Sequence, residues 1–239
     1  MEEIHPTYKN YPEVIEFSGT YCTLLGEELR NGIKIPSPRE EMEIRLKSSG
    51  KGKPNFGLNR GVWTSATFIY HAERPPLLTL LFNDVVDYYL QSYTPKEFYN
   101  LSNNVDKGYF TTGSSKCYDN FFKKATKDLE KKIANERNTL ILPFYENFSI
   151  VSNPGLKVFS FLARDNNTRK DYFELNRGED IFVVLRDKKL INSIEGTVLN
   201  QLWFSSLESN SRIRGEGNMG YIGWMRCLKK LYNDSSKKY

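Results

Sequence analysis

The sequence is poor in the residues that build disulfide frameworks, metal centres and membrane spans. Its 239 residues include three cysteines and two histidines, and the cysteines at 22, 117 and 227 are far apart, without a C-x-x-C pair. This usage argues against a disulfide scaffold and a zinc site and favours a reducing compartment. The longest apolar run, LLTLLF at 77–82, is too short to cross a bilayer, and no signal segment opens the chain. We therefore expect a cytoplasmic protein with no membrane partner, no metal and no cofactor.

Positive charge is distributed unevenly along the chain. The formal net charge is +5, and residues 212–239 hold seven Lys or Arg against two acids. A second stretch without acids, residues 44–60, combines glycines with five cations. Clustered cations beside glycine indicate a surface for phosphates. The alternative for either stretch is an ordinary solvated loop or tail.

The pattern of apolar residues predicts a mixture of strands and helices. Strands are expected over 12–25, 61–70, 156–163, 180–186 and 196–204, helices over 76–91 and 117–136, and a long loop or hairpin over 30–60. For residues 221–232 both a strand and a helix fit the spacing.

These elements predict an α+β protein. Because the helices do not alternate regularly with the strands, we expect an antiparallel sheet rather than a parallel one. The expected organisation is an α+β body over residues 1–153, with a basic hairpin insertion at 30–60, followed by a strand-rich C-terminal subdomain over 154–239.

The most distinctive segment is rich in glycine. Residues 211–230 read SRIRGEGNMGYIGWMRCLKK. The hexapeptide GEGNMG matches G-x-G-x-x-G, but only 19 residues follow Gly220, too few for the rest of a dinucleotide-binding or kinase domain. Glycines also leave backbone amides open to anions, and flanking arginines supply charge-assisted hydrogen bonds to phosphates. The alternative is a turn that leads into a last core element, with Tyr221 and Trp224 buried.

This glycine-rich loop, followed by GYIGWM, resembles the signature loop of the RAMP superfamily, the repeat-associated mysterious proteins of CRISPR systems. The matching positions are Gly215, Gly217, Gly220, Tyr221 and Gly223, with Ile222 as one additional residue. The basic stretch at 44–60 is similar to a thumb hairpin of these proteins. The resemblance implies a ferredoxin-like fold of the RNA-recognition-motif type, with an antiparallel sheet and two helices.

The resemblance also implies a function. The chain would be a non-catalytic RNA-binding subunit of a CRISPR RNA-guided surveillance complex of the Cascade type. It looks most like the subunit that caps the 5′ end of the guide RNA in type I complexes, type I-D among them. Its partners would be the guide RNA and the other subunits of this antiviral ribonucleoprotein complex. The residues expected to bind RNA are Arg212, Arg214, Gly215, Gly217, Gly220, Tyr221, Arg226, Lys229, Lys47, Lys51, Lys53 and Arg60.

Besides the RNA-binding subunit, two other classes of function remain open: a nuclease, which has two variants, and a protein–protein interaction module. A metal-free ribonuclease could use His71 as a general base, with Tyr70 and Lys53 beside it. A metal-dependent nuclease could use Asp180 and Asp187, but a gap of seven residues puts these carboxylates on opposite faces of one strand and too far apart to share a metal. The third class is a protein–protein interaction module whose basic tail meets an acidic partner.

Overall fold

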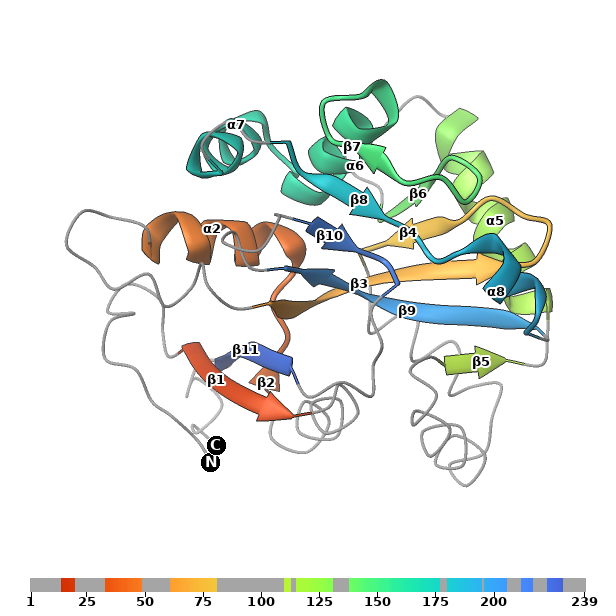
Figure 1. Ribbon diagram of the computed structural model, residues 1–239, viewed down its shortest axis with the longest axis horizontal. Helices are drawn as coiled ribbons and strands as arrows, with labels where there is room; N and C mark the ends of the chain where they lie inside the picture. Colours follow the sequence, from red (N-terminus) through yellow and green to blue (C-terminus); the bar gives the residue numbers. More distant parts are fainter. Residues whose placement is uncertain are drawn as a thin grey trace, which may run out of the picture.

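The computed structural model describes residues 14–19, 33–48, 61–80, 110–112, 115–130, 138–176, 180–194, 196–205, 212–216 and 223–229. These residues form a curled sheet with helices packed against it (Figure 1). The strands are β1 (Val14–Gly19), β2 (Ile33–Lys34), β3 (Val62–His71), β4 (Leu77–Thr79), β5 (Phe110–Thr112), β6 (Thr139–Ile141), β7 (Phe148–Ser149), β8 (Phe182–Val184), β9 (Thr197–Phe204), β10 (Arg212–Arg214) and β11 (Gly223–Lys229). The helices are α2 (Pro38–Ser48), α5 (Ser115–Glu130), α6 (Asn153–Ala163), α7 (Asn166–Leu175) and α8 (Lys188–Asn192).

The sheet is mixed, and its centre is the long antiparallel pair of β3 and β9. Within the described ranges the sheet has 11 strands, and its main path runs β1-β11-β3-β9-β10-β8-β7. Two neighbouring pairs on this path, β10 with β8 and β11 with β3, are parallel. The expected antiparallel, ferredoxin-like sheet with two helices is therefore wrong. The path also joins strands from both sides of the boundary expected at residue 153.

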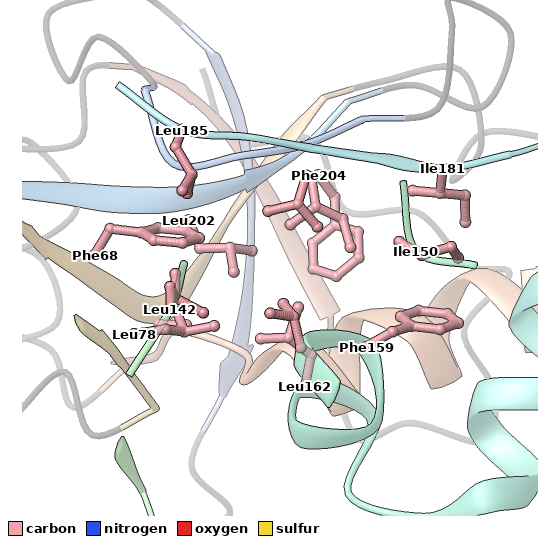
Figure 2. Packing of buried hydrophobic residues seen from close by; sticks show 14 of the residues in the cluster. Phe68, Leu78, Leu142, Ile150, Phe159, Leu162, Ile181, Leu185, Leu202 and Phe204 are labelled. Atoms are coloured by element: carbon pink, nitrogen blue, oxygen red, sulfur yellow. The ribbon is translucent and has the colours of Figure 1, made fainter. Parts of the chain in front are cut away.

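Residues of the sheet and of the helices α2, α6, α7 and α8 form the hydrophobic core, to which α8 contributes Ile191. Phe68 and Leu202 come from β3 and β9, and they face Phe159 and Leu162 of α6 (Figure 2). Met42 of α2 and Tyr172 of α7 complete this side of the core. Because side chains alternate along a strand, this packing fixes which residues of β8, β9 and β10 point away from the helices.

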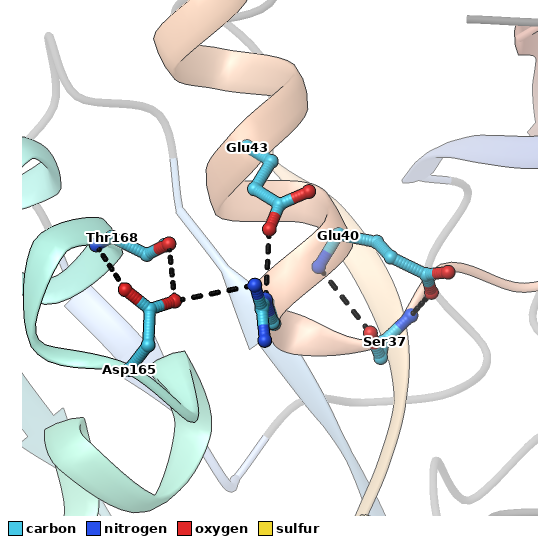
Figure 3. A network of polar contacts seen from close by, with 6 residues as sticks. Ser37, Glu40, Glu43, Asp165 and Thr168 are labelled. Carbon is cyan, nitrogen blue, oxygen red and sulfur yellow. Dashed lines mark hydrogen bonds and ion pairs between the residues drawn. The ribbon is translucent and has the colours of Figure 1, made fainter.

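Helix α2 begins with a capping box that the sequence analysis overlooked. The Ser37 amide donates to Glu40 Oε2 at 2.8 Å, and the Glu40 amide donates to Ser37 Oγ at 3.3 Å (Figure 3). These reciprocal bonds satisfy amides that a helix start leaves without intrahelical partners. The expected loop over 30–60 is therefore wrong between residues 38 and 48, because Pro36 precedes the helix and Pro38 is its first residue, where proline is tolerated.

Helix α6 corrects the strand expected over 156–163. Ser152 caps its start by accepting from the Gly155 amide, and Pro154 lies in its first turn, where a missing N–H costs nothing. The buried positions Val158, Phe159, Leu162 and Ala163 follow helical spacing. This segment is rich in residues that favour strands, but it forms a helix because Ser152 caps its start and its buried residues lie on one helical face.

The other expected elements divide into confirmed and wrong ones. The strands expected at 61–70, 180–186 and 196–204 correspond to β3, β8 and β9, and the helix expected at 117–136 corresponds to α5. Residues 223–229 form a strand, which decides the ambiguity over 221–232 for that part. The helix expected over 76–91 is wrong at 77–79, because β4 pairs with both β3 and β6.

Asp165 links the start of α7 to α2 and makes stability depend on pH. Its carboxylate accepts from the Thr168 amide at 2.8 Å and from Thr168 Oγ1 at 2.6 Å, and Arg39 Nη2 lies 3.4 Å away (Figure 3). The hydrogen bonds from Thr168, with a smaller contribution from Arg39, lower the pKa of Asp165. The stabilisation is therefore fully present above the unfolded pKa of about 3.9 and is lost as the pH falls through the lower folded pKa.

We expect Asp165→Asn to lower the midpoint of thermal unfolding by about 1–3 °C at neutral pH, because asparagine still caps the helix but carries no charge. Thermal unfolding followed by circular dichroism at pH 7 and near pH 2.5 measures this effect. The difference between variant and wild type should become smaller at the acidic pH, because the stabilisation is lost as the pH falls through the folded pKa. An equal difference at both pH values would contradict the role of the carboxylate charge.

Candidate binding surface

The first glycine of the glycine-rich segment is part of the core. The Gly215 amide donates to the Val184 carbonyl at 2.7 Å, and the Tyr70 hydroxyl donates to the Gly215 carbonyl at 2.9 Å. A Cβ at this position would lie 2.6 Å from Tyr70 Oη and 2.8 Å from the ring of Phe68. Glycine is therefore required here for close packing, and its amide already has a protein partner.

Arg186 adds further hydrogen bonds to those that Tyr70 and Val184 make with Gly215 at the start of the glycine-rich segment. Its amide donates to Tyr70 Oη at 3.3 Å, its Nε donates to Asn200 Oδ1 at 2.8 Å, and its Nη2 contacts the Glu216 carbonyl at 3.4 Å. Burial raises the pKa of Tyr70 well above its ordinary value, so the phenol stays a neutral donor. The network holds β8, β9 and the end of β10 in one fixed arrangement.

The opposite, outer side of the sheet exposes a patch over β8, β9 and β10. In the register of these strands Arg212 lies beside Phe182, and Arg214 lies between Val184 and Trp203. The intervening residues Ile213 and Val183 are buried in the core, so their neighbours in sequence point outward. We call this surface the outer patch, and it consists of Ser149, Phe182, Val184, Trp203, Arg212 and Arg214.

The outer patch combines the exposed Phe182 with the half-buried Trp203, Arg212 and Arg214. Phe182 is 46% exposed, whereas Val183 beside it is fully buried. The ring of Trp203 packs edge-on against Trp63, with ring centroids 4.5 Å apart. A Cβ at Gly61 would overlap the Trp203 indole, so this glycine also makes room for the ring. Trp203 is thus held in one position beside Arg214.

Charges in and around the outer patch are only partly paired. Arg214 lies 3.4 Å from Glu216, and Asp180 accepts a hydrogen bond from Ser149 Oγ at 2.6 Å. Arg212 is bound through its backbone: its amide donates to Ser205 Oγ at 2.6 Å, and its carbonyl accepts from the Ser205 amide at 2.9 Å. Within the part of the chain that the structure describes, no carboxylate pairs with its guanidinium. In that part of the chain Arg212 is therefore the arginine of the patch without an ion-pair partner.

His71 lies in an aromatic cluster at the far end of β3. Its Nδ1 is 2.6 Å from the Ala72 carbonyl, and its ring lies 5.5 Å from the ring of Tyr118. Burial raises the pKa of Tyr145 to about 12, and the Tyr145 hydroxyl donates to the His71 carbonyl. The hydroxyl of Tyr70 bonds on the core side of the strand, so it does not share a site with the His71 ring.

The expected carboxylate pair is used in local structure. Asp187 caps α8 by accepting from the Lys189 amide at 2.6 Å, and Asp180 bonds Ser149 at the other end of the segment. Among the residues that the structure describes, no group of three or more His, Cys, Asp or Glu side chains is placed to hold a metal ion. None of the described helices has the length and apolar character needed to cross a membrane.

The other residues expected to bind RNA are scattered over the sequence. Lys47 is exposed in the last turn of α2, and Arg226 and Lys229 lie on β11, opposite Glu16 of β1 and Ile33 of β2. The remaining residues lie outside the described ranges: Gly217, Gly220, Tyr221, Lys51, Lys53 and Arg60. RNA binding by this set stays a prediction.

Phe182 and Trp203 are surface residues that sequence reasoning missed. Each stands in a largely apolar run, IFVVL and QLWF, where alternation between core and solvent is hard to read. The register with Arg212 and Arg214 is what makes them part of one surface.

Comparisons with known proteins identify the fold. No protein-family profile matches the sequence, and no curated protein is similar to it. A solved structure is similar at a TM-score of 0.56 and 13% sequence identity, over 91% of this chain and 97% of that chain. It is described as "Accommodation of massive sequence variation in Nanoarchaeota by the C-type lectin fold". At this identity the likeness concerns the fold alone.

The likeness overturns the resemblance to the RAMP superfamily. The ferredoxin-like fold and the CRISPR assignment are wrong, because the mixed, curled sheet with parallel pairs matches a C-type lectin fold over nearly the whole chain. The loop motif that suggested the resemblance begins at a glycine packed on Phe68 and Tyr70. The chain is thus similar in fold to a C-type lectin fold protein.

Proposed function

We propose that this protein is a non-catalytic binding module that contacts a macromolecular partner through the outer patch. The observation that carries the proposal is the register of β8, β10 and β9, which places Phe182 beside Arg212 and Trp203 beside Arg214 on the outer face of the sheet. Aromatic residues and arginine are the side chains most enriched at binding hot spots. A cytoplasmic location, which the cysteine usage favours, is part of the proposal.

On β8 and β10 the residues that stabilise the fold and the residues that we propose to bind a partner point to opposite faces of the sheet. Ile213 and Val183 hold β10 and β8 on the core, whereas Arg212 and Phe182 project away from it. Outer side chains can therefore change with little cost to the fold. This division supports the proposal, because a similar structure is described in terms of the accommodation of massive sequence variation by the same fold.

The division makes a prediction about stability. We expect the outer double variant, Arg212→Gln with Phe182→Ser, to stay within about 1 kcal/mol of the wild type, since exposed substitutions change stability by about 0.5 kcal/mol each. In contrast, Ile213→Ala should cost about 2–5 kcal/mol, because Ile213 is fully buried. Urea unfolding of the three proteins measures both effects. An outer double variant as unstable as Ile213→Ala would show that the outer side chains are needed for the fold.

Binding is tested with selected ligands. The wild-type chain is panned against a random dodecapeptide display library and a random RNA pool, since RNA is the ligand that the sequence predicts for Arg212 and Arg214. Ligands of either class should lose affinity for the outer double variant and keep it for Lys170→Gln. Lys170 is a matched control, because its side chain is 73% exposed on α7, away from the patch. Ligands that bind all three proteins equally would refute the proposal.

A further inference from the structure

We propose that the partner is a protein segment that presents a carboxylate next to a large apolar side chain. The carboxylate binds the guanidinium of Arg212, and the apolar side chain packs on Phe182. This inference rests on the proposed function, because it names the chemistry of the ligand at the same outer patch.

Hydrogen bonds with Ser205 fix the backbone of Arg212, and this preorganises the residue for binding a carboxylate. Ser205 bonds both the amide and the carbonyl of Arg212, so the main chain at this position is held from one side. Arg212 as a residue is half-buried, and its guanidinium has no carboxylate partner within the described ranges. A guanidinium fork matches a carboxylate through two parallel hydrogen bonds, and a fixed backbone lowers the entropy lost on binding.

Phe182 and its surroundings supply the apolar part of the surface. Phe182 lies between Arg212 and Ser149 in the register, at the β7 edge of the main path of the sheet. Directly after β7, Val151 is 55% exposed, and Leu156 in the first turn of α6 is 43% exposed. This turn packs tightly on β7, since a Cβ at Gly155 would lie 1.9 Å from the Ser149 carbonyl oxygen. Val151 and Leu156 are therefore further exposed apolar side chains in the segment that follows β7.

The guanidinium of Arg212 is the group of the patch that suits an anionic ligand. Among the described residues Glu216 forms an ion pair with Arg214, whereas Asp180 only accepts a hydrogen bond from the neutral Ser149 hydroxyl and keeps its negative charge. Arg212 is the cation of the patch whose guanidinium has no carboxylate partner within the described ranges. A guanidinium with no carboxylate partner among the described residues, beside the exposed Phe182, suits one carboxylate next to an apolar side chain, whereas RNA draws its affinity from several cations along the phosphate backbone. The described surface thus favours a protein segment over RNA.

The test uses the dodecapeptide library, with selection on the wild type and counter-selection on Arg212→Gln. We expect the selected peptides to contain Asp or Glu within two residues of Leu, Ile or Phe. The affinity of the best peptide should fall about tenfold or more for Arg212→Gln and for Phe182→Ser, and should not change for Lys170→Gln. Replacing the acid of the peptide by its amide should weaken binding to the wild type but not to Arg212→Gln, because the two changes remove the same contact.

The outcomes separate this inference from the proposed function. Peptides without acids that depend on Phe182 but not on Arg212 would overturn the inference and leave the binding module in place. RNA from the random pool that binds the wild type and is lost with Arg212→Gln would do the same. If neither peptides nor RNA depend on the outer patch, both the inference and the proposed function fall.

Discussion

Arg45→Met is expected to lower the free energy of unfolding by about 3–5 kcal/mol, because it breaks an ion pair that is fully buried. Arg45 Nε lies 2.7 Å from Glu41 Oε1, and both side chains have 0% exposure. The substitution leaves the carboxylate of Glu41 buried without its guanidinium. Stabilities of natural domains are about 5–15 kcal/mol, so the loss is a large fraction of the total. The shift in the midpoint of urea unfolding measures this loss, provided that the slope of the unfolding free energy against urea concentration does not change.

Helix α2 itself contains the matched control. Arg39 and Glu43 form a pair with the same spacing as Glu41 and Arg45, at 2.8 Å, but the Arg39 side chain is 43% exposed. Arg39→Met should therefore cost less than about 1 kcal/mol, because water screens exposed pairs. Equal losses for Arg39→Met and Arg45→Met would show that burial does not decide the effect.

A double variant tests whether the buried, unpaired charge of Glu41 causes the loss of stability in Arg45→Met. Glu41→Leu with Arg45→Met removes both charges, and we expect it to recover most of the stability that Arg45→Met loses, since an apolar pair needs no compensating charge. Recovery must remain incomplete, because Arg45 also donates to the carbonyl of Ser205 at 2.9 Å and to the hydroxyl of Tyr172 at 3.2 Å. A double variant less stable than Arg45→Met alone would contradict this explanation.

This buried pair also supports the outer patch from the core side. Arg45 binds the carbonyls of Phe204 and Ser205, at the end of β9. Ser205 in turn bonds both the amide and the carbonyl of Arg212 on β10. A continuous chain of hydrogen bonds thus leads from the core of α2 to the main chain of the residue that we propose to bind the ligand. Ser205, between β9 and β10, therefore connects the buried ion pair that stabilises the fold with the residue that we propose to bind the ligand.

The sequence predicts best the elements whose signal is local. The strands β3 and β9 are rich in β-branched and aromatic residues, the helix α5 has helical periodicity, and all three lie at nearly the expected positions. The capping box at Ser37 and Glu40 was also readable, but the prolines and glycines around it favoured a loop. For α6 the β-rich composition outweighed a cap at Ser152 that agreed with helical spacing. In both helices the information was present and was weighted wrongly.

The topology and the surface could not be read in this way, because they depend on pairing between distant residues. Strand β4 follows two prolines that suit a helix start, yet it pairs with β6 more than 60 residues later. The parallel pairing of β10 with β8 brings Arg212 to Phe182 across 30 residues of sequence. Arg212 and Arg214 were expected to be surface residues from charge alone. Their aromatic neighbours became apparent only from the register.

Gly215→Ala is expected to destabilise the fold by about 1–3 kcal/mol, the usual cost of overpacking a core. The added Cβ would lie 2.6 Å from Tyr70 Oη and 2.8 Å from the ring of Phe68, and both side chains are fully buried. Chemical denaturation measures the loss. A loop glycine kept only to expose its amide to an anion would instead tolerate alanine, and a stability equal to that of the wild type would favour that interpretation.

The cause of this effect can be tested with Tyr70→Phe. Removing the hydroxyl leaves the Gly215 carbonyl and the Arg186 amide without the bonds that they make at 2.9 and 3.3 Å, and should cost about 1–3 kcal/mol by itself. It also removes the atom nearest to the added Cβ, so the two changes should be less than additive. In the Tyr70→Phe background Gly215→Ala should therefore cost less than in the wild type. Strict additivity would mean that the methyl group is accommodated elsewhere and that close packing on Tyr70 is not the reason for this glycine.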